Sequence, residues 1–324
     1  MRNECAVLIV STIADVATDE VAAKLSDRGV SFLRINTENY PLSGTLSTTL
    51  TPAPEHSVVS EFDQRQFSSP VSVWYRRMRT PSRPDDMDSG MYEFCLQENR
   101  AALLGSILSA SARWMSHPQA VWLAENKPYQ LSLASSLGLR IPRTLISNDP
   151  ATIQETFSRF SQMIVKPVRS GHFVRDGKEY SVFTSRVLSS HLEKIESARL
   201  APSIYQELIP KKFDIRVTIV GRRLFAVAID SQSDPDAMVD WRKTTNAKLP
   251  HYPLTLPIEI EKHLLNFMQL LGLTFGAIDM IQTPDGEFVF LEVNPSGQWL
   301  WIDDILSLGI SDAVADWLAG EGHP

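Results

Sequence analysis

The sequence predicts a mixed α/β fold, with a parallel α/β unit at the N-terminus and antiparallel sheet toward the C-terminus. Residues 6–37 give a short β-branched run, a helix-like stretch and a second strand-like run, which is how a parallel unit begins. Residues 213–230 form two strand-like runs around a Gly221-Arg222 turn. A third pair of runs, "GAIDMIQ" and "EFVFLEVN", flanks the turn "TPDG" at 283–286 and predicts an antiparallel hairpin.

Length and composition indicate a fully folded chain. The 324 residues are 43% hydrophobic and 21% charged, which suits about two domains of ordinary size. We expect an N-terminal domain over 1–118, a central subdomain over 119–204 and a C-terminal subdomain over 205–324.

Charge and cysteine content restrict the partners and the compartment. With 31 basic and 38 acidic side chains, the formal charge of −7 disfavours nucleic-acid binding, which needs clustered Lys and Arg. The two cysteines, Cys5 and Cys95, lie in apolar contexts without CxxC spacing and predict free thiols. No segment approaches about 18 uninterrupted apolar residues, so no membrane partner is expected and a cytoplasmic location is predicted.

The first third of the chain continues the α/β pattern. Residues 41–70 are rich in Ser, Thr and Pro and predict short hairpin strands and loops, before a strand at 71–77. Residues 89–114 carry apolar side chains at helical spacing with few breakers, which predicts one long helix.

The middle of the chain carries clear helix-boundary signals. Asn126 is a candidate N-cap, Pro128 lies early in the helix and Gly138 is placed to end it. Further predicted elements follow in order: a helix near Pro150, a strand at 162–168, a polar loop at 169–180, a strand at 180–187, a helix-like 189–197, a strand at 203–209, and helices near 258–271 and 311–319.

The stretch "FLEVNPSGQWLW" at 290–301 places polar side chains inside an apparent buried strand. Glu292 and Asn294 share one face by their even spacing, and Asp279 falls opposite residues 290–292, depending on a bulge. Two carboxylates and an amide oxygen suit Mg²⁺. The alternative is that Asp279 bonds a turn or loop while Glu292 pairs with an arginine such as Arg216; spacing leaves both open.

Three cationic side chains are further candidates for the site. Lys166 ends a strand and is either an edge residue or a phosphate partner. Arg216 shares a strand face with Thr218 and needs a carboxylate or a phosphate. Arg242 follows a polar loop and is mobile or faces a ligand.

The absence of several catalytic motifs argues against other classes of enzyme. The sequence has no HExxH, no GxSxG elbow, no GxxxxGK[ST] P-loop and no glycine-rich dinucleotide fingerprint after the first strand. The pair Trp299 and Trp301 is a core candidate by default, with a peptide platform as the alternative.

An ordered series of motifs spans nearly the whole chain: Lys127, "VKP" with Lys166, "YQELI" at 205–209, "FDIR" at 213–216, "DWR" at 240–242, "IDM" at 278–280 and "LEVNPSGQW" at 291–299. This series resembles the ATP-grasp superfamily, and in detail the microviridin-type peptide ligases that make graspetides. The stretches "VWYRR" and "AENKPYQLSLASSLGLRIPRTLISNDP" add to the resemblance.

The resemblance implies an ATP-grasp fold with a pre-ATP-grasp domain, ATP and Mg²⁺ as cofactors, and a set of site residues. Catalytic roles fall to Arg216, Lys166 and Arg242. ATP contacts are implied for Lys127, Lys166, Gln206, Glu207, Leu208, Asp214 and Arg242, with Glu207 and Leu208 as the adenine hinge. The metal ligands would be Asp279, Glu292 and Asn294.

The resemblance also implies an activity and partners. A side-chain carboxylate of a ribosomal precursor peptide would be activated as an acyl phosphate and closed into an ester or amide ring. The leader peptide is expected near 168–198, although only Gly171 and Gly177 represent the usual glycine-rich flap there, and a homodimer is expected. The alternatives are a ligase that joins two molecules and an inactive peptide-binding scaffold.

Overall fold

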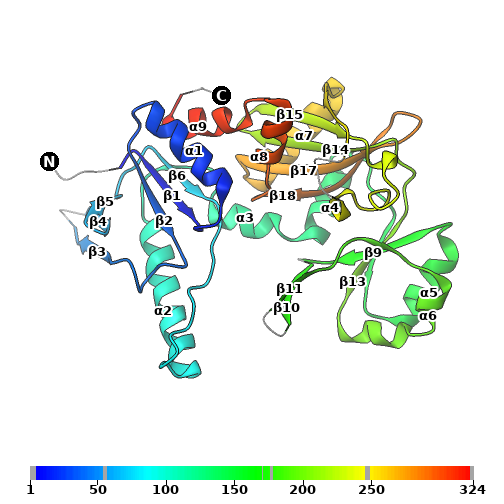
Figure 1. The fold of residues 1–324 in the computed structure, drawn as a ribbon, viewed down its shortest axis with the longest axis horizontal. Coiled ribbons are helices and arrows are strands. Elements are labelled where there is room, and N and C mark those ends of the chain that lie inside the picture. The colour runs from blue at the N-terminus through cyan, green and yellow to red at the C-terminus, as the bar shows by residue number, and fades with distance from the viewer. Residues whose placement is uncertain (1–4, 54–56, 170, 176–177, 245–248, 322–324) are drawn as a thin grey trace. The chain divides into compact units, whose positions relative to one another are not determined.

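The computed structural model describes residues 5–53, 57–169, 171–175, 178–244 and 249–321, and two compact units divide them (Figure 1). The first unit spans the chain to residue 118, with residues 298–300 and the segment from 309 onward. The second unit spans 119–297 and 301–308. The C-terminal part of the chain therefore alternates between the units: residues 298–300 belong to the first, 301–308 to the second and the segment from 309 to the first again.

The first unit is built on a parallel sheet, as the opening strand-helix-strand pattern predicts. Its strand order is β2-β1-β6-β7, with β1 at Val7–Ser11, β2 at Phe32–Asn36, β6 at Ser72–Tyr75 and β7 at Arg113–Trp114. A small antiparallel sheet adds β3 (Leu46–Thr51), β4 (Ser57–Phe62) and β5 (Arg65–Gln66). The expectation of hairpin strands within 41–70 is confirmed.

Helices cover this parallel sheet because alternate residues of a strand point to opposite faces. Leu8 and Val10 of β1 pack with Leu103 and Ile107 of α2 (Ser89–Leu108) in one apolar cluster. Helix α1 (Val16–Asp27) packs against α9 (Ile310–Ala319), and the Lys24 ammonium lies 3.0 Å from an Asp312 carboxylate oxygen.

Helix α2 is shorter than the sequence pattern predicts. It ends at Leu108, and Arg113 and Trp114 join the parallel sheet as β7 instead of continuing the helix to 114. The Ser109 hydroxyl donates to the Gly105 carbonyl at the point where the helix ends. Serine hydroxyls compete for backbone carbonyls in this way, and "SAS" at 109–111 follows directly.

In the second unit, a four-stranded antiparallel sheet has the order β12-β9-β13-β8. Its strands are β8 (Thr144–Ser147), β9 (Met163–Pro167), β12 (Ser185–Arg186) and β13 (Ser203–Glu207). Ile153 of α5 (Pro150–Arg159) packs with Met163 and Tyr205 to form its core. Strand β9 lies between β12 and β13, but β12 pairs only with Ile164 and Val165, so among the described residues Lys166 pairs with Ile204 of β13 alone.

Two connections of this sheet differ from expectation. The predicted polar loop at 169–180 contains an antiparallel hairpin, β10 (His172–Arg175) with β11 (Lys178–Ser181), in which the rings of Phe173 and Tyr180 stack with centroids 5.3 Å apart. The predicted helix at 189–197 divides into α6 (Ser189–Leu192) and a 3₁₀ helix at Ile195–Leu200. Gly177 lies outside the described residues.

The second sheet of this unit is antiparallel, in the order β16-β15-β14-β17-β18. Its strands are β14 (Phe213–Val220), β15 (Arg223–Ile229), β16 (His251–Leu254), β17 (Phe275–Gln282) and β18 (Phe288–Asn294). Helix α7 (Ile258–Leu271) packs on it, and the Phe267 and Phe290 rings meet edge to face at 5.0 Å. Both predicted hairpins, β14–β15 and β17–β18, are confirmed.

Shorter helices complete the chain. They are α3 (Pro118–Ala124), α4 (Lys127–Ser136) and α8 (Leu300–Leu306), with single 3₁₀ turns at Ser231–Ser233 and Trp241–Lys243. Asn126 precedes α4 as predicted, but its side-chain amide donates to the Trp122 and Leu123 carbonyls and so closes α3. Gly138 takes a positive φ of 83° just after α4, which confirms the predicted stop.

Among the described residues, every helix is too short or too polar to cross a bilayer.

Candidate nucleotide and metal site

Three charged residues form a row across three neighbouring strands of the antiparallel sheet. The register places Arg216 of β14 opposite Asp279 of β17, and Asp279 opposite Glu292 of β18. A bulge between Asp279 and Met280 sets this last pairing. The sequence left the partner of Asp279 open between 290 and 292, and the bulge selects 292.

Direct contacts join this row to two further residues. The Arg216 Nη1 donates to Asp279 Oδ1 at 2.9 Å, and the Asn294 Nδ2 donates to Asp279 Oδ2 at 3.2 Å. Glu292 is paired with Lys127 instead, with Nζ 2.9 Å from Oε2. The alternative in which Glu292 pairs with Arg216 is wrong: each carboxylate has its own cation, and both face the same region.

The charges around Glu292 and Lys166 identify one electrostatic cluster. Burial opposes ionisation of Glu292, but the charges of Lys166, Lys127 and Arg242 lower its pKa to about 2. Burial is the main cause that lowers the pKa of Lys166; Glu292 opposes this effect and the charges of Lys127 and Arg242 add to it. Three cations therefore surround one buried carboxylate, an arrangement that suits a ligand carrying several negative charges.

Arg242 is held in a fixed orientation by its own loop. Its Nε and Nη2 donate to the two carboxylate oxygens of Asp240, each at 2.8 Å, and the backbone N–H of Thr184 donates to Asp240 at 3.1 Å. Burial would lower the pKa of Arg242, but the hydrogen bonds and charge of Asp240, with the charges of Asp279 and Glu292, raise it. The sequence pattern did not reveal this pairing of Asp240 with Arg242.

The turn that follows β18 brings backbone against Arg216. In "NPSG", the Gly297 N–H donates to the Asn294 carbonyl at 3.1 Å, as in a β-turn with proline at its second position. A Cβ on Gly297 would lie 2.4 Å from the Ala277 Cβ and 2.9 Å from Arg216 Nη2. Glycine is therefore needed for close approach at this position.

Asp214 lies two residues before Arg216 on the same face of β14. Both of its carboxylate oxygens accept from Lys211 Nζ, at 2.9 and 2.7 Å. Burial raises the pKa of Asp214, and Lys211 opposes that shift. Lys211 was not among the residues singled out from the sequence, because "IPKKFD" gives no periodic signal for which lysine turns inward.

The proposed hinge residues lie at the end of β13, and several of their groups are engaged within the protein. The Glu207 carboxylate accepts from the Arg143 backbone N–H at 3.0 Å and from Arg143 Nε at 2.6 Å. The Glu207 N–H donates to the Arg143 carbonyl, and the Leu208 N–H to the Gln162 carbonyl. Buried Gln206 donates to the Thr144 hydroxyl at 2.9 Å.

The donor set fits a divalent cation. Asp279, Glu292 and Asn294 present hard oxygen donors, and Mg²⁺ typically takes one or two protein carboxylates and completes its shell with water and phosphate. Because the Asn294 amide nitrogen faces Asp279, its carbonyl oxygen is the remaining donor. Within the described residues no group of three or more His, Cys, Asp or Glu side chains gathers, so a site held entirely by such ligands is not found there.

The two tryptophans occupy different surroundings. Trp299 is fully buried and packs in the first unit, 6.0 Å from the Trp74 ring and with the Arg76 guanidinium 4.7 Å over its face. Its expected core role is confirmed. Trp301 is partly exposed and lies 5.3 Å from the Trp241 ring, beside Arg242 in the chain.

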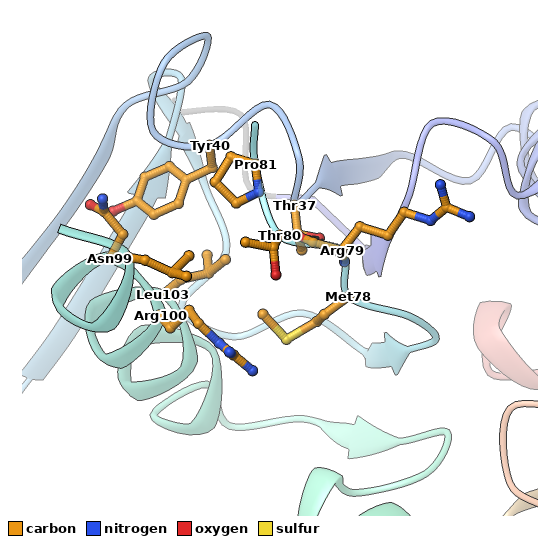
Figure 2. Close-up of a pocket in the computed structure, with 10 residues that line it drawn as sticks. Thr37, Tyr40, Met78, Arg79, Thr80, Pro81, Asn99, Arg100 and Leu103 are labelled. Atoms are coloured by element: carbon orange, nitrogen blue, oxygen red, sulfur yellow. Dashed lines mark hydrogen bonds between the residues drawn. The ribbon is translucent and has the colours of Figure 1, made fainter. Parts of the chain in front are cut away.

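A separate pocket lies within the first unit, between α2 and the segment that follows β6 (Figure 2). Tyr40, Pro81 and Leu103 supply apolar surface, and Arg79 and Arg100 contribute cations. Figure 2 shows the Arg79 and Arg100 side chains extending in different directions. They do not converge on one anion, which separates this pocket from the phosphate-type arrangement around Lys127, Lys166 and Arg242.

Comparisons with known proteins agree with this architecture. The sequence model of the MvdD pre-ATP grasp domain matches residues 6–122. A RiPP-associated ATP-grasp ligase of Chryseobacterium gregarium, solved with ADP and a leader and core peptide, is 29% identical with a TM-score of 0.90, over 99% of this chain and 98% of that chain. The macrocyclase MdnC of Microcystis aeruginosa, solved with precursor peptide MdnA, is 34% identical with a TM-score of 0.84, over 97% and 99% of the two chains.

Curated relatives are more distant. The β-citrylglutamate synthase B of Danio rerio is 27% identical over 219 residues, which is 64% of this chain and 50% of that protein. The chain thus spans about half the length of this curated relative.

Fold and site together define an ATP-grasp protein, with the parallel pre-ATP-grasp unit, the small antiparallel sheet and the larger antiparallel sheet that the motif series implied. Within that superfamily, the chain belongs to the graspetide-type family of ATP-grasp peptide ligases that includes MdnC.

Proposed function

We propose that the protein is an ADP-forming carboxylate ligase that matures a ribosomal precursor peptide by closing ester or amide rings within it. The observation that carries the proposal is the site in the second unit, where Lys127, Lys166 and Arg242 surround Glu292, and Arg216 orients Asp279. The relatives solved with ADP and peptides support the same reading. The proposal includes the division into 1–118, 119–204 and 205–324.

The proposed reaction has two steps. An Asp or Glu side-chain oxygen of the peptide attacks the γ-phosphorus of ATP, the bond to the bridging β–γ oxygen breaks, and ADP leaves. A Ser or Thr hydroxyl, or a Lys amine, then attacks the acyl carbon; it loses a proton, and phosphate departs with the former carboxylate oxygen. Each ring therefore costs the peptide one water.

The residues divide this work by charge and position. Lys127, Lys166 and Arg242 bind phosphate oxygens, and Arg216 neutralises charge at the transferred group. Gln206, Glu207 and Leu208 hold the adenine side, with Asp214 toward the ribose. When bound through Asp279, Glu292 and Asn294, Mg²⁺ supplies charge neutralisation of the phosphates.

Peptide binding is proposed for residues near 168–198. The β10–β11 hairpin carries the stacked pair Phe173 and Tyr180, which are 48% and 44% exposed, and Val182 follows at 50%. Exposed aromatic rings of this kind suit an apolar leader segment. A Cβ on Gly171 would lie 2.3 Å from the Val182 carbonyl, so glycine permits the close strand approach at the base of the hairpin.

Two further parts of the proposal concern assembly and location. We propose that the protein forms a homodimer. Helix α2 exposes three apolar side chains that can supply the interface: Met91, Phe94 and Leu108. Phe94→Glu should then lower the molecular mass in solution, measured by light scattering, from that of a dimer to that of a monomer. We also propose a cytoplasmic location, with which the free thiol of Cys95 is consistent.

Mass spectrometry of the precursor tests the function. Incubation with ATP and Mg²⁺ should remove one water per ring from a single peptide and release one ADP for each ring. A gain in mass would indicate ligation of a second molecule. ADP release that peptide does not stimulate, with no change in peptide mass, would indicate a scaffold and overturn the proposal.

A further inference from the structure

Strand β18 carries two of the three candidate metal ligands, yet it lies at the edge of its sheet. One side of an edge strand has no neighbouring strand to pair its backbone groups. Glu292 and Asn294 flank Val293, so the backbone at Val293 determines how both side chains are presented. The structure shows what holds that backbone.

Helix α4 supplies a side chain that takes the place of a neighbouring strand. The Val293 N–H donates to Gln130 Oε1 at 2.9 Å, and Gln130 Nε2 donates back to the Val293 carbonyl at 3.0 Å. The same Nε2 also donates to the Ala124 carbonyl at the end of α3. One amide thus makes the two bonds that an antiparallel partner residue would make, and it ties β18 to α3 and α4.

The position of Gln130 links this contact to the phosphate side of the site. Gln130 is 2% exposed and lies three residues after Lys127, so both side chains leave the same face of α4. Lys127 contacts Glu292, and Gln130 contacts the next residue of β18. Two side chains of α4 therefore contact two successive residues of the strand that carries the candidate ligands.

We infer that Gln130 is a positioning residue that fixes the edge strand β18 so that Glu292 and Asn294 meet the same cation. The inference rests on the proposed Mg²⁺–nucleotide function. Gln130 touches neither nucleotide nor metal in this scheme, and it acts through the backbone of Val293. Residues that orient metal ligands typically change metal affinity by about 10–100-fold when replaced.

The test compares Gln130→Met with Leu131→Met. The first keeps side-chain length and removes all three hydrogen bonds; the second is a volume-conserving change at the next buried position of α4. ADP affinity is measured by calorimetry with Mg²⁺ and with EDTA. We expect Gln130→Met to reduce the Mg²⁺-dependent gain in ADP affinity by about tenfold or more, with ADP binding in EDTA within about twofold of wild type.

Each outcome decides between the inference and the function on which it rests. A wild-type protein that gains no ADP affinity from Mg²⁺ overturns the proposed function. A wild-type gain that Gln130→Met retains in full overturns the positioning role alone, even if that variant melts at a lower temperature. A loss of the gain in both variants also overturns it, because the effect would then belong to general packing of α4.

Hydrogen exchange of the wild-type protein provides a measurement that does not depend on a variant folding. The Val293 amide should be protected in the absence of nucleotide, although it lies on the outer side of an edge strand. Exchange of that amide at the rate of an unprotected peptide would overturn the inference.

Discussion

Arg216 and Asp279 face each other on neighbouring antiparallel strands, with Arg216 Nη1 2.9 Å from Asp279 Oδ1. The Arg216 side chain is 7% exposed and the Asp279 side chain 13%, so little water screens the pair. Because Asp279 is also a candidate metal ligand, its contact with Arg216 fixes the orientation of a carboxylate that the proposed cation would use. The pair thus serves both the fold and the proposed chemistry.

Replacing Arg216 with alanine should separate these two contributions. The substitution leaves Asp279 without its cation, and removing one partner of a buried pair costs about 3 kcal/mol of unfolding free energy. We expect a folded but less stable protein that forms no rings, measured by chemical denaturation and by mass spectrometry of the precursor. Glu292→Ala should likewise abolish ring formation.

The control is Arg159→Ala on α5, which removes an exposed pair with Glu155 and should cost less than about 1 kcal/mol. Ring formation that persists in Arg216→Ala would contradict the role assigned to this arginine.

Gly297 gives a second prediction, in which backbone space decides the outcome. A methyl group there would lie 2.4 Å from the Ala277 Cβ and 2.9 Å from Arg216 Nη2, so Gly297→Ala must displace the turn or the guanidinium. We expect a loss of about 1–3 kcal/mol in unfolding free energy, together with weaker Mg²⁺–ADP binding.

Gly105→Ala is the matched control, because nothing lies within 4 Å of a Cβ at this helical position. It should stabilise the protein by about 0.5–1 kcal/mol through helix propensity. Equal melting temperatures for the two alanine variants would show that the crowding at Gly297 is relieved at no cost.

The sequence predicted the elements whose signals are local. The turn residues at 283–286 and Gly221 set the two hairpins, and even spacing placed Glu292 and Asn294 on one face. The C-terminal limit of α2 was missed, because the apolar spacing continues to residue 114 while serine side chains and pairing with β6 end the helix at Leu108. Pairing between distant segments leaves no periodic signal in either segment.

The same distinction applies to the candidate site. Asp279, Glu292, Arg216 and Lys166 could be singled out because each is a charge inside an apolar strand. The partners that orient them could not: Asp240 and Lys211 stand in polar loops, and Gln130 looks like an ordinary helix residue until α4 packs on β18. The choice of cation for Glu292 also depended on that packing, since it placed Lys127 within reach and left Arg216 to Asp279.

The lowered pKa of Asp240 predicts that the protein loses stability at acid pH. Burial opposes its ionisation, but the hydrogen bonds and charge of Arg242, with backbone donors, lower its pKa from 3.8 to about 2. A depressed folded-state pKa stabilises the protein above the unfolded value, and this contribution is lost as the pH falls from about 3.8 toward 2. Its size is about 2 kcal/mol.

Asp240→Asn should therefore lower stability at neutral pH and flatten the dependence of the unfolding free energy on pH below 4. Urea titrations between pH 3 and 7 measure both effects, with Asp27→Asn at an exposed position of α1 as control. A variant whose unfolding free energy falls below pH 4 as steeply as that of the wild type would show that Asp240 does not cause this pH dependence.

We predict that Lys166 lowers the stability of the unliganded protein and strengthens ADP binding. Burial first, and then the like charges of Lys127 and Arg242, lower its pKa, which means that the folded protein disfavours its ammonium form. In the interval between the lowered folded pKa and the ordinary lysine pKa of 10.5, the unfolded chain binds more protons, so stability should rise with pH there. Lys166→Met should remove this rise and, at neutral pH, leave the unfolding free energy unchanged or higher by about 1 kcal/mol.

The same substitution should weaken ADP binding by about tenfold or more, because a phosphate loses a charge-assisted partner worth about 1.5–3 kcal/mol. Thermal melts without ligand and calorimetry with ADP measure the two sides separately. Lys211→Met is the comparison. In the wild-type protein the Lys211 Nζ donates to both carboxylate oxygens of the buried Asp214, at 2.9 and 2.7 Å. The substitution leaves that carboxylate without its cation and should lower stability instead. If Lys166→Met lost stability as Lys211→Met does and still bound ADP normally, Lys166 would be a structural cation, and the phosphate role would pass to Lys127 and Arg242.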